Sequence, residues 1–144
     1  MSFQDLLNKS VDSVERPAPL PEGTYEVLIK AHNFGESDRK KTPYCEFEYQ
    51  LMATGLDVDK ERLDSALKGK PLSERSIRDS FYITEKALPR LREFLERAGV
   101  NIVGRPFTQC IPEAIGRRVL IFVKQEAGEG DVIYNNVSKY AALE

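Results

Sequence analysis

The chain has 144 residues, of which 41% are hydrophobic and 31% charged, and its formal net charge is −2. This length predicts one domain, large enough to bury a hydrophobic core without disulfides or metals. The acidic balance, with a pI of about 5.6, excludes a globally basic, histone-like binder, although a local cationic patch can still recognise an anion. The single histidine, His32, excludes catalytic and metal sites that need two.

Three further features bear on the cellular compartment. Cys45 and Cys110 fit no metal-ligand spacing and are typical of buried thiols in a reducing environment. The start of the chain, MSFQDLLNKS, lacks the basic and then apolar order of a secretion signal. No apolar run in the sequence approaches the roughly 20 residues that span a membrane. We therefore expect a cytoplasmic protein without membrane association.

Residues 1–22 are expected to form an N-terminal arm. One face of a short helix would be formed by the apolar residues Phe3, Leu6, Leu7 and Val11. The proline-rich run 16–21 cannot continue that helix, because proline lacks an amide proton and restricts the residue before it. The arm either docks on a partner or a second subunit, or is a loosely attached tail.

Residues 23–54 predict two long strands joined by a polar loop. Apolar and polar residues alternate in both halves, as in half-buried strands whose successive side chains point to opposite faces. The expected core-facing residues are Tyr25, Val27, Ile29 and Ala31 in the first strand and Cys45, Phe47, Tyr49, Leu51 and Ala53 in the second. The connection is rich in turn-forming residues, and its tip carries three cations: Arg39, Lys40 and Lys41.

Residues 55–98 predict an insert, a strand and a helix. The polar insert 55–75 contains a short helix, with Asp59 as its N-cap and Gly69 beyond its end. Residues 76–84 predict a third strand that places Asp79 on the apolar face and Tyr82 on the other. A helix capped by Thr84 is expected to run to about Ala98, with an apolar stripe of one residue per turn.

The last third of the chain predicts a hairpin. Residues 100–116 are expected to connect the helix to the next strand, with a helical turn near 112–115. Residues 117–125 predict a fourth strand buried on both faces. A glycine-containing turn then leads to a fifth strand at 132–140. In this strand Tyr134 and Tyr140 are expected to close the barrel, and Asn135 or Asn136 to satisfy a turn or strand end.

This order of elements predicts a mainly β domain over residues 23–142. Three strands, a helix and two more strands are the order of an OB-fold, a five-stranded antiparallel barrel. A parallel α/β architecture fits poorly, since only one crossover helix is available.

Several segments also resemble a known family. These are PEGTYEVLI from Pro21, the pattern F-E-Y-x-L from Phe47, LERAGV at the end of the helix, and GRRVLIFVKQE followed by YNNVSKY. Together they are similar to phage-encoded proteins of replication and recombination gene clusters, over roughly residues 21–140. The resemblance implies an OB-fold that binds single-stranded DNA.

Sequence-tolerant binding of single strands needs cations along the phosphates and rings on which bases stack. An OB-fold binds its ligand across strands two and three and grips it with the loops between strands one and two and four and five. The predicted nucleic-acid contacts are therefore Lys30, His32, Phe34, Arg39, Lys40, Lys41, Tyr44, Arg78, Tyr82, Lys124 and Lys139. The alternative is a solvated hairpin, since Glu36 and Asp38 offset the loop cations and Glu46 and Glu48 share a face with Tyr44.

We therefore expect a sequence-tolerant single-stranded-DNA-binding protein, acting in phage replication or recombination within the host cytoplasm. No Ser-His-Asp set, phosphate loop or H-E-x-x-H motif occurs, so we expect no enzyme, no cofactor and no metal. Its partners would be single-stranded DNA and phage replication or recombination proteins, and a homo-oligomer stays open. The alternative function is an OB-like module that recruits a phage recombinase, nuclease or virion component.

Overall fold

The computed structural model describes residues 3–8, 18–128, 130 and 132–143. Val11 and the start of the proline-rich run lie outside these residues. The strands are β1 (Gly23–Glu36), β2 (Pro43–Thr54), β3 (Ser76–Tyr82), β4 (Arg118–Ala127) and β5 (Ile133–Ala141). The helices are α1 (Phe3–Leu7), α2 (Lys60–Leu67), α3 (Leu88–Arg97) and α4 (Phe107–Glu113), with a 3-10 turn at Leu72–Glu74.

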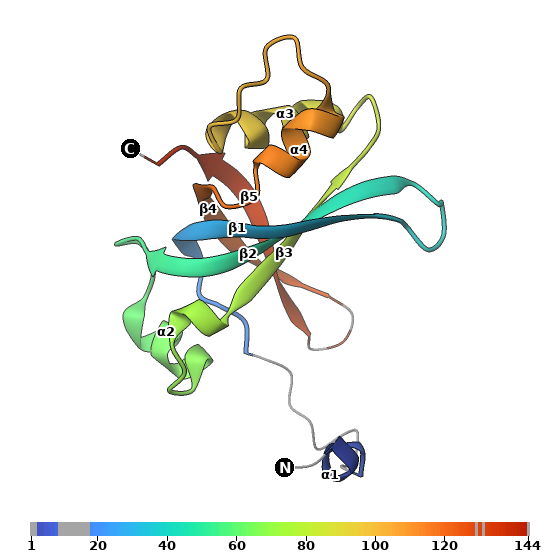
Figure 1. The fold of residues 1–144 in the computed structure, drawn as a ribbon. Coiled ribbons are helices and arrows are strands. Elements are labelled where there is room, and N and C mark those ends of the chain that lie inside the picture. The colour runs from blue at the N-terminus through green and yellow to red at the C-terminus, as the bar shows by residue number, and fades with distance from the viewer. Residues whose placement is uncertain (1–2, 9–17, 129, 131, 144) are drawn as a thin grey trace.

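The five strands form one antiparallel sheet in the order β3-β2-β1-β4-β5 (Figure 1). This confirms the mainly β prediction and all five strand segments. β1 is central, because β2 pairs with nearly its whole length and β4 with residues 23–28. The edge strands β3 and β5 form no ladder with each other among the described residues. The sheet is therefore not closed, and the expected closed barrel is not observed.

Arg90 of α3 fills the seam between the two edge strands. Its guanidinium donates to the carbonyl of Ser80 on β3 (3.1 Å) and to that of Val137 on β5 (3.3 Å). The hydroxyl of Tyr140 on β5 donates to the carboxylate of Asp79 on β3. Side chains thus bridge the edges where a closed barrel would have backbone hydrogen bonds, and they occupy carbonyls that such a ladder would need.

The core lies between the sheet and α3, and its centre is aromatic. Ring centroids lie 4.8–5.9 Å apart in this cluster. Its members are Phe47, Tyr49, Phe81, Phe94 and Tyr140. Of the two tyrosines expected to close a barrel, Tyr140 is buried in this cluster, whereas the side chain of Tyr134 is 50% exposed on the β4–β5 hairpin. Both cysteines are buried and unpaired.

A β-bulge in β1 interrupts the predicted alternation of core-facing and outward-facing residues. The register shifts between Ile29 and Ala31, so that His32 lies opposite Phe47 on the core side and Ala31 opposite Glu48 on the outer side. Ala31 is therefore exposed. A bulge inserts one extra residue and reverses the facing of every residue beyond it.

Two other parts of the sheet are less buried than predicted. Ala53, expected in the core, is exposed near the end of β2. In β4 only one face is fully buried, because Leu120 and Phe122 on the other face remain partly accessible. A run of consecutive apolar residues therefore did not indicate a strand covered on both faces.

The helices follow the predicted signals with two changes. Asp59 caps α2 as expected, accepting from the amides of Glu61 (3.0 Å) and Arg62 (3.2 Å). α3 begins at Leu88, because Thr84 instead holds a preceding turn through its contacts with Ala87. Residues 107–113 form the additional helix α4 ahead of the expected turn.

α3 and α4 lie at one end of the sheet and α2 at the other (Figure 1). No helix of the described residues is long and apolar enough to span a membrane.

The last residues of the predicted arm pack against the sheet. Leu20 is fully buried in the core, and its amide donates to the side-chain oxygen of Asn135 (2.8 Å). Its carbonyl accepts from the amide groups of Gln125 (2.8 Å) and Asn135 (2.9 Å). Asn135 therefore holds the incoming chain against the β4–β5 hairpin rather than satisfying a turn.

The buried tyrosines should make the free energy of unfolding decrease at alkaline pH. Burial raises the pKa of Tyr25 to about 12 and also raises the pKa of Tyr49 and of Tyr140. The folded protein therefore keeps protons that the unfolded chain releases near pH 10, so the free energy of unfolding should fall as pH rises from 10 towards 12. The slope is about 1.4 kcal/mol per pH unit for each tyrosine.

This prediction is tested by denaturant unfolding at a series of alkaline pH values. Tyr25→Phe should show a shallower decline than the unmodified protein, since one of the three ionisable hydroxyls is removed. A free energy of unfolding that stays constant over this pH range would contradict the assignment.

Candidate nucleic-acid interface

The two predicted base-stacking residues lie directly opposite each other on the outer face of the sheet. Tyr44 of β2 pairs with Tyr82 of β3, and on its other side Tyr44 faces Gly35 of β1. A Cβ atom added at Gly35 would lie 2.6 Å from the Tyr44 hydroxyl oxygen, so the tyrosine ring lies across the glycine backbone. Tyr82 is 49% exposed and Tyr44 is half-buried. We call Gly35, Tyr44 and Tyr82 the tyrosine row.

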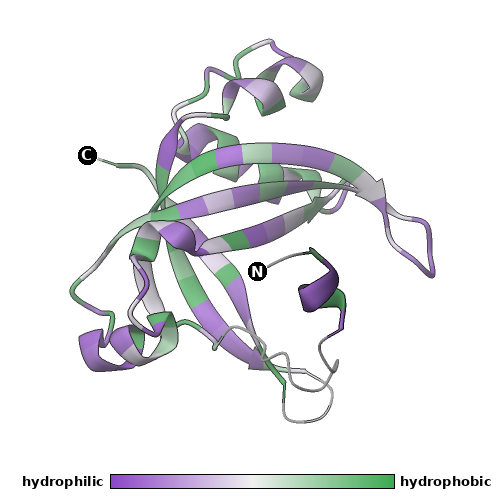
Figure 2. Cartoon of the chain, turned by 60° about the horizontal axis from the view of Figure 1, so that its bottom comes forward, coloured by the Kyte–Doolittle hydropathy of each residue, from purple (hydrophilic) through white to green (hydrophobic). Residues whose placement is uncertain are grey.

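The tyrosine row lies next to the predicted cationic loop. The amide of Ser37 donates to the carbonyl of Thr42 (2.9 Å), and the amide of Thr42 donates to the Ser37 hydroxyl (3.0 Å), which closes the loop. Lys41 takes the left-handed conformation, with φ of 53°, that lets the chain turn. The β1–β2 hairpin projects from the body of the sheet, and its tip is hydrophilic (Figure 2).

The loop cations are available to a ligand. Arg39, Lys40 and Lys41 are exposed, and in the described part of the chain none of them forms an ion pair. Glu36 and Asp38, which could have neutralised them, are exposed and form no ion pair among the residues that the structure describes.

The middle of the outer face carries a net negative charge. Arg78 lies opposite Glu48 and forms an ion pair with Glu46 (3.6 Å), whose carboxylate also accepts from the Ser80 hydroxyl (3.3 Å). We call Glu46, Glu48 and Arg78 the acidic row. Two carboxylates beside one guanidinium leave a net negative charge, which disfavours a phosphate at this position.

Five other predicted contacts lie apart from the tyrosine row. The bulge turns His32 and Phe34 to the core side of the sheet, where their rings pack edge to face at 5.7 Å. Lys124 of β4 and Lys139 of β5 are exposed, but β1 separates their strands from β2 in the sheet. Lys30 is exposed beside the bulge of β1.

A hollow of about 590 Å³ opens between the β1–β2 loop, the end of β3 and the start of α3. We call it the loop–helix hollow. It is lined by Ser37, Lys40, Thr42, Tyr82, Thr84, Lys86, Ala87 and Arg90. The hollow adds residues that were not predicted as contacts from the sequence, among them Ser37, Thr84, Lys86 and Arg90. The available signal was a lysine between the third strand and its helix, but nothing in the sequence places that lysine beside Lys40.

A buried charged network supports the back of this hollow. Asp79 is 7% exposed, and it accepts hydrogen bonds from Tyr49 (2.9 Å), Arg90 (3.2 Å) and Tyr140. Burial raises the pKa of Asp79, while its hydrogen bonds act in the opposite direction. Burial opposes the charge on Arg90, but Asp79 and the tyrosines raise the pKa of this arginine overall. Arg90 thus joins the core to the surface of the hollow.

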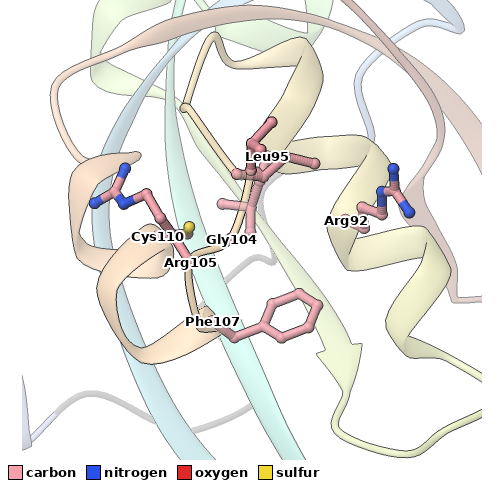
Figure 3. Close-up of a pocket in the computed structure, with 8 residues that line it drawn as sticks. Arg92, Leu95, Gly104, Arg105, Phe107 and Cys110 are labelled. Carbon is pink, nitrogen blue, oxygen red and sulfur yellow. The ribbon is translucent and has the colours of Figure 1, made fainter.

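A second hollow of about 390 Å³ lies between α3 and α4 (Figure 3). Leu95, Phe107 and Cys110 contribute to its lining, and Val103 at its edge is 83% exposed. The guanidinium groups of its two arginines point away from each other in Figure 3. Both are already paired: Arg105 binds Glu113 through two hydrogen bonds (2.6 and 2.7 Å), and Arg92 binds Glu96 (2.8 Å). This hollow therefore suits an apolar group better than a phosphate.

Tyr134 forms a comparable ring-over-glycine arrangement on the β4–β5 hairpin. A Cβ atom added at Gly128 would lie 2.1 Å from its ring. Glu126 lies directly opposite Tyr134, so the surroundings of this ring are acidic. The hairpin therefore provides an exposed tyrosine outside the proposed site, which serves as a comparison in the experiments below.

Comparison of the chain with protein-family models and with curated proteins found no match.

Proposed function

We propose that this protein binds single-stranded DNA without strong sequence preference. The observation that carries the proposal is the tyrosine row beside a loop of three exposed cations that form no ion pair with any described residue. Rings provide stacking surfaces for unpaired bases and cations attract the phosphates, and these are the two requirements for sequence-tolerant binding. A duplex keeps its bases stacked internally, so it should bind less tightly to the same surface.

The strand order supports an OB-fold as the architecture behind this function. An OB barrel has the neighbours found here, with β1 between β2 and β4 and with β3 and β5 at the seam. We propose that the protein is a diverged, incompletely closed OB-fold of the phage family that its segments resemble. It would act in the host cytoplasm during replication or recombination, as a binding protein without a cofactor.

The function is tested by fluorescence anisotropy with a labelled oligothymidine of about 30 nucleotides, a length above the footprint of one OB-fold. We expect micromolar or tighter binding that weakens as salt rises, and poorer binding to a matched duplex. A folded sample that does not bind at low salt would overturn the proposal.

The loop cations should account for much of this affinity. Replacing Arg39, Lys40 and Lys41 together by alanine is expected to weaken binding about tenfold at about 0.1 M salt and to reduce the salt dependence. The melting temperature should not change, because all three side chains are exposed. In the matched control, Lys60, Arg62 and Lys70 are replaced together by alanine, which removes the same charge from the α2 region. Equal losses in the two triple variants would show that only net charge matters.

The second candidate is a protein-interaction module. The hollow between α3 and α4 favours it, because its two arginines are neutralised by internal partners and Leu95, Phe107 and Cys110 remain for contact with an apolar group. Such a module would hold a phage recombinase, nuclease or virion component. Failure to bind DNA, together with affinity for such a protein that Phe107→Ala removes, would identify this function.

A further inference from the structure

The loop–helix hollow differs from the acidic row in its charge. Its lining contains Lys40, Lys86 and Arg90 and no carboxylate. Arg90 is held by Asp79 behind the lining, whereas Lys40 and Lys86 form no ion pair within the described residues. Both lysines are exposed and come from segments 46 residues apart in sequence. Two lysines without an ion pair in the described part of the chain thus line one concave surface.

The hollow also offers hydroxyl groups whose hydrogens remain available as donors. The Ser37 hydroxyl oxygen accepts from the amide of Thr42 (3.0 Å), and that of Thr84 accepts from the amide of Ala87 (3.2 Å). A hydroxyl that accepts in this way can still donate its own hydrogen. Phosphate oxygens are acceptors, so they match both the hydroxyls and the lysines around the hollow.

Tyr82 belongs to both the tyrosine row and the hollow. It pairs with Tyr44 across the strands and also lines the hollow, so it connects the two surfaces. A strand that left the tyrosine row in the other direction would cross Glu46 and Glu48. Charge repulsion makes that direction unfavourable for a phosphate backbone, whereas the hollow attracts it.

We propose that a single strand bound at the tyrosine row continues past Tyr82 into the loop–helix hollow, where Lys40 and Lys86 contact its backbone phosphates. This inference rests on the proposed DNA-binding function and adds the path of the strand and the contact from Lys86. The path follows the end of the sheet that carries the β1–β2 loop, and it avoids the acidic row.

The test compares single lysine variants in the oligothymidine assay over a range of salt concentrations. Lys40→Ala and Lys86→Ala should each weaken binding about fivefold at about 0.1 M salt, and each should reduce the salt slope by about 0.7, the value for one phosphate contact on a single strand. Lys60→Ala and Lys70→Ala are the controls, because each removes the same charge from an exposed lysine of the α2 region that does not line the hollow. Both controls should change affinity less than twofold.

The outcomes separate the path from the function. If the unmodified protein binds and the four variants behave alike, the path is wrong and the DNA-binding function stands. If Lys40→Ala and Lys86→Ala lose affinity and the controls do not, the path is supported. If the folded, unmodified protein does not bind single strands at all, both proposals fail.

Amide chemical-shift mapping gives an independent readout on the unmodified protein. On addition of oligothymidine, shifts are expected in residues 37–42, 82 and 84–87, which surround the hollow. Shifts concentrated instead around Glu46, Glu48 and Arg78 would place the strand across the acidic row and overturn the path.

Discussion

Replacement of Arg90 by alanine is expected to lower the free energy of unfolding by about 2–3 kcal/mol. Removing one partner of a buried ion pair typically costs 3–5 kcal/mol, because the other charge is left buried without compensation. The cost should be smaller here, since the Arg90 side chain is 42% exposed and water reaches part of the pair. Arg90 also stacks over the Phe81 ring at 4.6 Å, a contact that alanine would lose. Denaturant unfolding measures the effect.

Asp79→Asn provides the control for this prediction. In the Arg90→Ala background it removes the uncompensated charge but leaves an oxygen to accept from Tyr49 and Tyr140. The double variant should therefore recover part of the stability lost in Arg90→Ala. If the double variant is less stable than Arg90→Ala alone, the buried carboxylate is not the source of the loss.

Removal of both rings of the tyrosine row should have the largest effect on binding. Tyr44→Ala combined with Tyr82→Ala is expected to weaken the oligothymidine complex at least about 30-fold, because each stacked base contributes about 1–3 kcal/mol. Both rings lie on the outer face, away from the core, so the melting temperature should change little. Anisotropy and thermal unfolding of the same sample separate the two effects.

Two controls test the role of the tyrosine hydroxyl and the position of the ring. Phenylalanine at both positions keeps the rings and should retain most of the affinity, since stacking does not use the hydroxyl. Tyr134→Ala removes a similarly exposed ring from the other hairpin and should leave binding unchanged. An equal loss from Tyr134→Ala would place the strand on both hairpins and contradict the assignment of the tyrosine row.

Much of the fold could be predicted because most strands are amphipathic. Period-two alternation located β1, β2 and β3, and a continuous apolar run located β4. Asp79 was recognisable as the one charged residue on an apolar face, and it is buried within hydrogen-bonding distance of Tyr49 and Arg90. The bulge near Lys30 could not be predicted, because no glycine or proline marks it and the pattern on either side remains regular.

The open seam between β3 and β5 could not be predicted either. Strand order alone does not show whether edge strands pair, and Arg90 comes from a helix whose polar side gave no sign of reaching the sheet. For the candidate site, Tyr44, Tyr82 and the loop cations followed from strand facing and composition. Lys86 did not, because its proximity to Lys40 depends on how the hairpin and α3 pack.

The seam also bears on association between copies of this chain. An unpaired strand edge can act as a template for a strand of another molecule, which leads to aggregation. Here Arg90 already binds one carbonyl on each free edge, at Ser80 and at Val137. A charged side chain at an edge is also among the features that discourage edge-to-edge pairing. One arginine thus binds a carbonyl on each free edge and places a charge there, which disfavours intermolecular strand pairing at the seam.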